Sequence, residues 1–315
     1  MNILLWSKKM IKKYIAPGAP RLLGKKHNND LESEETKSYW TDHNVTSHHG
    51  FHDKKDSFDY FDWRNDQYFN YIELMPVAGQ DNKAVLDFGC GPGHDLVGFG
   101  VYSKPCRLIG VDISPSSLAE ASDRLSLHGV TAELMQLSPA AAELPFESAT
   151  FDHIHCSGVL HHTLDPVGIL RELCRVLRRE GTMNVMVYNY ESLWLHLYVA
   201  YQRRIVQGLY GDQDIREQFK RSTDGENCPI SNCYRPSEWV ALCNSAGLNA
   251  EFLGAAISMH EAALLPLRFA AIQDRRLSVE SRKFLLDLKF DDRGYPKYNG
   301  HYAGVDACYR LTKAD

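Results

Sequence analysis

The sequence predicts an α/β protein built around a mostly parallel β-sheet. From residue 83 onward, apolar strand-like runs alternate with helix-like segments, which is typical of parallel strands joined by crossover helices. A glycine-rich turn separates the first of these strands from the first helix, and two acids, Asp87 and Asp112, stand where the first two strands end. The 315 residues suffice for one elaborated α/β domain or for two smaller domains.

Each connection in the first half of the sheet carries its own helix signal. The glycine turn at 89–93 leads directly into a helix. Ser114 is a good N-cap with Pro115 at the first helical position, and Gly129 should end that second helix. The strands are expected at 83–88, 107–111, 131–135, 151–156 and 182–187.

The helix between the fourth and fifth strands should begin at Asp165 and Pro166 and end at Gly181. Its apolar residues recur at helical spacing and form one buried stripe. These residues are Ile169, Leu170, Leu173, Val176 and Leu177.

After residue 188 the alternation lapses. A helical cap insertion with a polar loop is expected at 191–235, followed by a helix at 236–247. Two further strands are expected at 250–257 and 305–311. The long excursion between them includes a helix and is a candidate lid or oligomer contact.

An N-terminal segment, residues 1–75, is expected to precede the sheet domain at 76–315. Residues 1–15 have the spacing of a short amphipathic helix with lysines between its apolar residues. Residues 27–59 are polar and rich in histidine, with little periodicity, whereas the aromatic residues of 60–75 favour a helix that packs on the sheet domain.

The net charge of −5 is unevenly distributed along the chain. Residues 1–26 hold seven cations and no acid, so the remaining residues carry 28 basic and 40 acidic side chains, a net −12. An acidic body opposes a broad phosphate-binding surface, and a nucleic-acid substrate is therefore disfavoured. The basic segment itself is either a lid helix or solvated tail, or a peripheral contact with an anionic membrane.

The composition also bears on the compartment. No window approaches 18 consecutive apolar residues, and lysines interrupt the apolar residues at the start, so neither a transmembrane helix nor a secretory signal is expected. Eight cysteines without a C-x-x-C pair indicate free thiols in a reducing, cytoplasmic setting. The sequence leaves the oligomeric state open, with a dimer as one option.

The glycine turn is the strongest chemical signal. A dinucleotide-binding G-x-G-x-x-G turn starting at Gly89 would require glycine at 94, where His94 stands. The actual pattern places the carboxylate of Asp87 just before the turn, and a carboxylate suits a cationic ligand end better than a pyrophosphate. Asp112 follows Gly91 by 21 residues, where an acid can accept hydrogen bonds from ribose hydroxyls. A nucleoside with a cationic amino-acid tail, such as S-adenosylmethionine, fits both acids.

Residues 85–93, Val-Leu-Asp-Phe-Gly-Cys-Gly-Pro-Gly, resemble motif I of the class I S-adenosylmethionine-dependent methyltransferases. Residues 108–114 resemble the family's next motif, whose acid binds the ribose. The resemblance covers 60–190 well and 236–312 weakly, and it is nearest to the branch with the quinone, sterol and natural-product enzymes. Segments similar to the later motifs follow in family order at 144–146, 151–152, 159–162 and 175–181.

The resemblance implies a Rossmann-like sheet with an antiparallel C-terminal strand, an N-terminal helical segment over the cofactor, and the helical cap. It also implies transfer of a methyl group from S-adenosyl-L-methionine to a small or medium-sized metabolite of natural-product or quinone-like type, at an oxygen, nitrogen or carbon atom. The cofactor-binding residues that it implies are Asp87, Gly89, Cys90, Gly91, Gly93, Asp112, Ile113, Ala141, Ser157 and Arg64. Its candidate catalytic residues are His161 and His162, and its candidate substrate-binding residues are Tyr188 and Tyr190.

The chain departs from the family pattern at Ala140, where members commonly place an acid near the adenine amino group. Adenine contact would then fall to the backbone around Ala141 or to Gln136. The family's Pro-Gly-Gly before the fifth strand is Arg179-Glu180-Gly181 here, which changes a turn rather than the chemistry.

Simpler interpretations stand beside these. The two acids could be helix caps or surface ion pairs, the paired histidines could be helix-start or core residues, and Arg64 could belong to helix packing. A second histidine cluster matches no standard ligand spacing, so no metal site is predicted. That cluster consists of His43, His48, His49 and His52. Two other functions remain: an RNA methyltransferase, favoured by the basic N-terminus, and a non-catalytic protein that binds S-adenosylmethionine.

Overall fold

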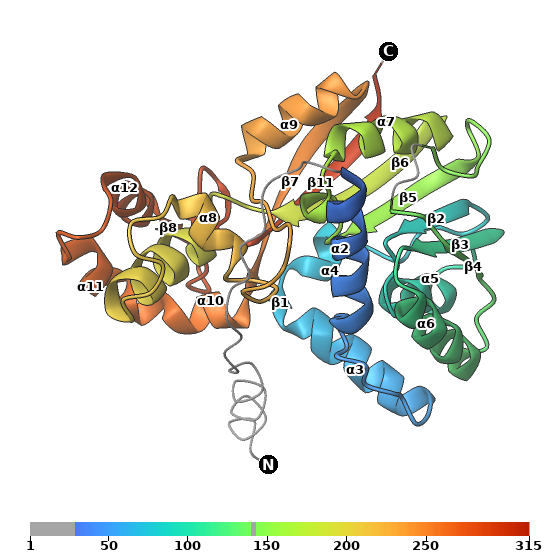
Figure 1. Cartoon of the computed structure of the whole chain (residues 1–315), viewed down its shortest axis with the longest axis horizontal. Coiled ribbons are helices and arrows are strands. Elements are labelled where there is room, and N and C mark those ends of the chain that lie inside the picture. The colour runs from blue at the N-terminus through green and yellow to red at the C-terminus, as the bar shows by residue number, and fades with distance from the viewer. Residues whose placement is uncertain (1–28, 140–142, 315) are drawn as a thin grey trace.

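The computed structural model describes residues 29–139 and 143–314 and shows a twisted eight-stranded sheet at the centre of the chain (Figure 1). The strand order is β1-β7-β11-β6-β5-β2-β3-β4. The strands are β1 (Tyr68–Phe69), β2 (Ala84–Phe88), β3 (Arg107–Asp112), β4 (Glu133–Gln136), β5 (Phe151–Ser157), β6 (Leu177–Tyr188), β7 (Leu248–Ser258) and β11 (Asp306–Lys313).

The expected parallel half of the sheet is confirmed. β2 pairs in parallel with both β3 and β5, and β4 and β6 continue the parallel pairing on either side. The register sets Asp87 beside Gly110 on one side and His155 on the other. Because parallel strands all end at the same edge, Asp87 and Asp112 lie at one edge of the sheet, where α/β proteins bind ligands.

The antiparallel C-terminal strand is also confirmed. β11 lies between β6 and β7 and runs antiparallel to both. Its first residue, Asp306, stands opposite Tyr188 of β6 and Ala256 of β7. The start of β11 therefore lies at the same edge of the sheet as the ends of the parallel strands.

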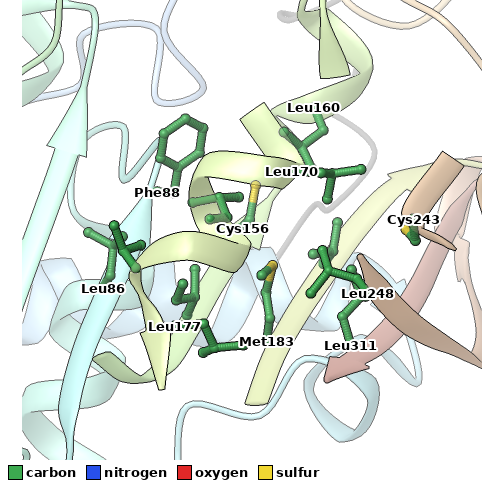
Figure 2. Packing of buried hydrophobic residues seen from close by; sticks show 14 of the residues in the cluster. Leu86, Phe88, Cys156, Leu160, Leu170, Leu177, Met183, Cys243, Leu248 and Leu311 are labelled. Atoms are coloured by element: carbon green, nitrogen blue, oxygen red, sulfur yellow. The ribbon is translucent and has the colours of Figure 1, made fainter. Parts of the chain in front are cut away.

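Helices cover both faces of the sheet. α5 and α6 pack on one face, and α7 and α9 pack on the other (Figure 1). Figure 2 shows the second layer, where Leu86 and Phe88 of β2 lie under Leu170 of α7, and Cys243 of α9 packs near Leu248 of β7. These helices are α5 (His94–Tyr102), α6 (Pro115–His128), α7 (Pro166–Val176) and α9 (Pro236–Ser245).

Two helix ends test the expected capping signals. Ser114 caps α6 by accepting a hydrogen bond from the Ser117 N–H, and Gly129 ends it in the left-handed region, as expected. The expected end of α7 at Gly181 is wrong: the helix ends at Val176, and Leu177 already has extended backbone angles. Gly181 lies inside β6, where an added Cβ would come within 2.7 Å of Leu177 Cδ1.

The N-terminal segment contains more helix than its periodicity indicates. α2 (Asn29–Asp42) lies wholly in the stretch 27–59, which was expected to have little periodicity, and the first half of α3 (Lys54–Asp66) lies there too; neither helix has a continuous apolar stripe. The single helix expected at 60–75 is wrong: α3 ends at Asp66, β1 pairs with β7, and Asn70 takes a left-handed φ of 70° before α4 (Tyr71–Leu74). The basic helix expected at 1–15 lies outside the described residues.

The cap is formed by two excursions of the chain rather than by 191–235 alone. The first contains the π-helix η2 (Trp194–Val206) and α8 (Ile215–Lys220). The second, between β7 and β11, packs on η2 and shares an apolar cluster with it. It contains α10 (Met259–Leu264), η3 (Leu265–Leu267), α11 (Arg268–Gln273), α12 (Val279–Asp287) and the small sheet β8 (Lys289–Phe290), β9 (Pro296–Tyr298) and β10 (His301–Tyr302).

Glu261 of α10 joins the two excursions to the sheet. Its fully buried carboxylate accepts hydrogen bonds from the backbone N–H groups of Trp194 at 2.8 Å, Ser258 at 2.8 Å and Val305 at 3.3 Å, and from the Ser258 hydroxyl. No helix among the described residues is long and apolar enough to cross a membrane.

Replacing Leu173 by alanine should lower the free energy of unfolding by about 2–5 kcal/mol, because this side chain of α7 is fully buried against the sheet and its loss leaves a cavity. The measurement is guanidinium chloride unfolding. Arg171→Ala is the matched control on the exposed side of the same helix and should change the value by no more than about 0.5 kcal/mol. Equal effects of the two variants would contradict this packing.

Candidate functional site

The glycine turn after β2 is fixed by a close contact with the loop after β5. An alanine Cβ at Gly89 would lie 2.2 Å from Val159 Cγ2, and the backbone there has a φ of +76°, so both space and conformation require glycine. At Gly91 the φ is +51°, and nothing lies within 4 Å of the position that a Cβ would take. The turn is thus closed toward the β5 loop and open at Gly91.

Asp112 lies beside this open position. Its two carboxylate oxygens accept hydrogen bonds from the backbone N–H groups of Gly91 and Ser114, each at 2.8 Å. Burial raises the pKa of Asp112, while the backbone donors lower it. The carbonyl of the next residue, Ile113, accepts a hydrogen bond from the side chain of Gln136 at 3.2 Å. Gln136 is one of the residues named above for adenine contact. Each oxygen of Asp112 still has a lone pair available for another donor.

Asp87 is 2% exposed, and within the described residues its Oδ2 has no hydrogen-bond donor. Burial raises its pKa, whereas the neighbouring His155 lowers it. His155 Nε2 in turn lies 3.3 Å from Asp95 Oδ2, and Arg64 Nη1 lies 3.9 Å from Asp95 Oδ1. Basic and acidic side chains thus alternate in the order Arg64, Asp95, His155 and Asp87, and Asp87 lies just before the glycine turn.

The guanidinium of Arg64 is held over the ring of Tyr71, 5.2 Å from its centroid. Its Nη1 is enclosed, and no acceptor bonds it within the described part of the chain. Tyr71 also forms a hydrogen bond with Ser157 at the end of β5. Arg64 and Ser157 therefore lie near the same edge as Asp87.

The remaining predicted cofactor residues differ in what they offer. The Cys90 N–H donates a hydrogen bond to the Val111 carbonyl, and the Cys90 carbonyl accepts one from the Gly93 N–H. The buried thiol of Cys90 lies against Gly110. Gly93 begins α5 with a left-handed φ of 76°. Cys90 is thus a packing residue whose backbone is already engaged, whereas Ala141 lies outside the described residues.

His161 and His162 form a short 3₁₀ turn, η1 (Leu160–His162), after β5. His161 is fully buried and stacks on Tyr188 with ring centroids 3.8 Å apart. Burial and the neighbouring His162 lower its pKa well below the usual value, so it is neutral at pH 7. Its two ring nitrogens have no hydrogen-bond partner within residues 29–139 and 143–314.

His162 belongs to a polar cluster that the sequence analysis did not foresee. Its Nδ1–H donates to the Ile230 carbonyl at 2.5 Å, and its Nε2 lies 3.6 Å from Asp224 Oδ2. The Tyr188 hydroxyl donates to both carboxylate oxygens of Asp224, at 3.0 and 3.1 Å. The thiol of Cys228 lies 3.9 Å from His162 Nδ1, and ligand atoms of His162, Asp224 and Cys228 gather within 4.8 Å, close enough to hold a metal ion.

α2 spans the two halves of this site. Trp40 packs edge-on against His162 with ring centroids 4.8 Å apart, and Tyr39 donates a hydrogen bond to the backbone carbonyl of Asp224. At its other end, the carbonyl of Thr41 accepts a hydrogen bond from Ser116 of α6 at 2.7 Å. Figure 1 shows α2 crossing in front of the sheet edge.

Tyr190, a predicted substrate-binding residue, lies away from the cluster, as does His48. The hydroxyl of Tyr190 bonds Glu280 of the cap at 3.1 Å, and the guanidinium of Arg235 lies 3.9 Å from its ring centroid, so its polar group faces a surface ion network. His48, from the N-terminal histidine cluster, lies 2.6 Å from Glu120 of α6 and takes part in anchoring the turn after α2.

One acidic residue at this edge was missed by the sequence analysis. Asp306 is 3% exposed and begins β11 opposite Tyr188. The sequence signal for it was an acid within the apolar run of a predicted strand, Val305-Asp306-Ala307-Cys308. Burying an ionised side chain in such a strand costs free energy, which points to a function.

Comparisons with known proteins agree with this geometry. Residues 86–185 match the family model of the methyltransferase domain. The tRNA U34 carboxymethyltransferase of Aliarcobacter butzleri is 32% identical over 120 residues, 38% of each chain. The 27-O-demethylrifamycin SV methyltransferase of Amycolatopsis mediterranei is 29% identical over 110 residues, 35% of this chain and 39% of the relative.

The chain spans less than half the length of the curated relatives that it matches. Its fold is similar to that of a SAM-dependent methyltransferase from Thermotoga maritima, with a TM-score of 0.50, 15% identity, and coverage of 88% of this chain and 99% of the other. The matched domain contains the glycine turn, Asp112 and the paired histidines. Residues 86–185 are thus a methyltransferase domain, and the sheet that contains them has the fold of a SAM-dependent methyltransferase.

Proposed function

We propose that the protein transfers a methyl group from S-adenosylmethionine to a small molecule bound between the sheet edge and the cap. The observation that carries the proposal is the enclosed cluster of His162, Asp224 and Tyr188 beside the loop that packs on the glycine turn. An imidazole backed by a carboxylate is suited to accepting a proton from an acceptor group near pH 7.

The residues around the glycine turn fit the cofactor. Among the described residues, Asp87 Oδ2 and Arg64 Nη1 make no hydrogen bond, although Arg64 Nη1 lies 3.9 Å from Asp95. The two groups are complementary to the ammonium and carboxylate ends of the cofactor's methionine part. The open position at Gly91 leaves room for close approach, and Asp112 has free lone pairs for the ribose hydroxyls. When bound, the cofactor supplies an electrophilic methyl group on a sulfonium sulfur, so the protein contributes mainly by positioning the acceptor.

Within the cluster, we assign the proton-accepting role to His162. Its Nδ1–H is committed to the Ile230 carbonyl, so the lone pair lies on Nε2, on the side of Asp224. Asp224 would stabilise the imidazolium that forms after proton transfer, and the Tyr188 hydroxyl holds this carboxylate in place. The neutral ring of His161 forms a wall of the site against Tyr188.

A small acceptor is favoured by the enclosure of the cluster. His161 and His162 are 0% and 5% exposed, beneath α2 and the loop of 222–231. The net −12 outside the first 26 residues also opposes contact with a phosphate backbone. A tRNA substrate is the second candidate, because a relative is named as a tRNA carboxymethyltransferase, but the likeness extends over only 38% of either chain.

Methyl-labelled S-adenosylmethionine, incubated with the protein and a cell extract divided into metabolite and RNA fractions, should label the metabolite fraction. Mass spectrometry of that fraction then identifies the product. The control is the His162→Ala variant, which should leave both fractions unlabelled. Label confined to RNA would replace this proposal with the tRNA alternative, and absence of label from both fractions would favour a non-catalytic binding protein.

The affinity for S-adenosylhomocysteine should rise with pH across the range in which Asp87 loses its proton. Because burial raises the pKa of Asp87, the free protein keeps this proton above the usual carboxyl range, and only the ionised form pairs with the ligand ammonium. Calorimetry at several pH values should show this trend in the wild type. Asp87→Asn should flatten it and weaken binding by about 1.5–3 kcal/mol. A slope that survives in Asp87→Asn would remove Asp87 from the ammonium site.

His162→Ala and Tyr188→Phe should lower kcat, the first by about 10²–10⁴-fold, because proton transfer is lost or misdirected. Tyr190→Phe is the matched control: its hydroxyl bonds Glu280 in the cap, so kcat should stay near the wild-type value. Turnover is measured at saturating acceptor, with cofactor affinity followed in parallel. Wild-type kcat in His162→Ala would exclude His162 as the base.

A further inference from the structure

Asp306 occupies the acceptor side of the site. It stands directly opposite Tyr188 in the β6–β11 ladder, and opposed residues of an antiparallel pair project from the same face of the sheet. Tyr188 on that face packs on His161 and bonds Asp224. The Asp306 side chain is therefore directed to the face that carries the polar cluster.

Among the described residues, the carboxyl group of Asp306 has no hydrogen bond of the kind that satisfies a structural buried acid. Glu261 shows the contrast, because its four hydrogen-bond donors satisfy it fully and one of them comes from Val305, the residue before Asp306. Asp306 is 3% exposed. Within residues 29–139 and 143–314, Glu261, Arg64 and Asp224 act on its carboxyl group through charge and not through a hydrogen bond. An ionised carboxylate in this position is costly unless a ligand pairs with it.

The charges around Asp306 favour a cation. The titratable groups that face it are Tyr68 of β1, Glu261 of α10, Asp224 of the cap loop, Arg64 of α3, and Tyr188 and Cys308 of the adjoining strands. Two of these are carboxylates, and the one guanidinium also faces Asp95 and lies over Tyr71. Tyr68 and Tyr188 both pack against the apolar cluster that contains Val305, the residue before Asp306. Aromatic rings in such a neighbourhood can stabilise an ammonium group.

We propose that the acceptor molecule carries a basic amine and that Asp306 binds this group as an ammonium ion. The inference rests on the proposed function and names its substrate class. It assigns Asp306 to binding and leaves proton transfer with His162. The amine anchors the molecule and brings a second group to His162 for methylation. The amine nitrogen itself can be methylated only after it has given a proton to His162, because an ammonium nitrogen has no lone pair.

The protonation of Asp306 agrees with this role. Burial, followed by Glu261 and Asp224, raises the pKa of Asp306 to about 8, while Arg64 lowers it. The empty site therefore holds a proton at neutral pH, and an arriving ammonium favours its release. Amine binding should strengthen as the pH rises toward about 8, and this dependence should vanish in Asp306→Asn.

The test uses full-length protein saturated with S-adenosylhomocysteine and a panel of alkylamines and arylalkylamines, each paired with the alcohol of the same carbon skeleton. Calorimetry should show that at least one amine binds about tenfold or more tightly than its alcohol, the preference expected for one charge-assisted hydrogen bond. Asp306→Asn, which keeps the shape of the side chain, should abolish this preference. Glu251→Gln, an exposed change on β7, is the matched control and should preserve it.

Failure of the inference is separable from failure of the proposed function. The inference is overturned if no amine is preferred over its alcohol, if the preference survives Asp306→Asn, or if the labelled metabolite lacks a basic nitrogen. In each of those cases methyl transfer itself can still be observed. Label that enters only RNA would instead overturn the proposed function. S-adenosylhomocysteine affinity in Asp306→Asn should equal that of the wild type, which shows that the variant is folded.

Discussion

The contact between Val159 and Gly89 joins the two halves of the site. Because Gly89 has no side chain, the Val159 side chain packs directly on the glycine turn and holds the loop with the paired histidines against it. A methyl transfer requires the acceptor and the sulfonium sulfur to meet within a narrow range of distance and angle. In the proposed reaction, this contact would set their relative placement.

Local signals in the sequence were sufficient to bring together the residues that are proposed to bind the nucleotide. Asp87, the glycine turn, Asp112 and the Ser114 cap all lie within one strand–turn–helix–strand unit, where short spacing determines which groups meet. The parallel order of the strands and the antiparallel placement of β11 followed from the alternation and the family resemblance. The predicted end of α7 at Gly181 was wrong because a glycine near a helix end is a common stop signal. Gly181 instead lies at a crowded position within β6.

The acceptor side depends on contacts between distant residues. His162 meets Asp224 across 62 positions, and Asp306 joins them only because β11 inserts beside β6. Helix α2 gave no periodic signal, since its few contacts with Asp224, His162 and Ser116 are spread over a mostly polar surface. Spacing arguments recover neighbours within one unit of structure, whereas such pairs require the tertiary fold.

The insertion of β11 between β6 and β7 also constrains how the chain can fold. β6 and β7 adjoin in the sequence of strands but not in the sheet, so β7, with β1 at its edge, joins the parallel strands only after residues 306–313 have been synthesised. Such pairing of distant segments pays its loop-closure entropy first and is slow. During synthesis on the ribosome, the edges of β6 and β7 that pair with β11 would stay unpaired until β11 is available. The proposed acceptor side, with His162, Asp224 and Asp306, would be among the last parts of the molecule to form.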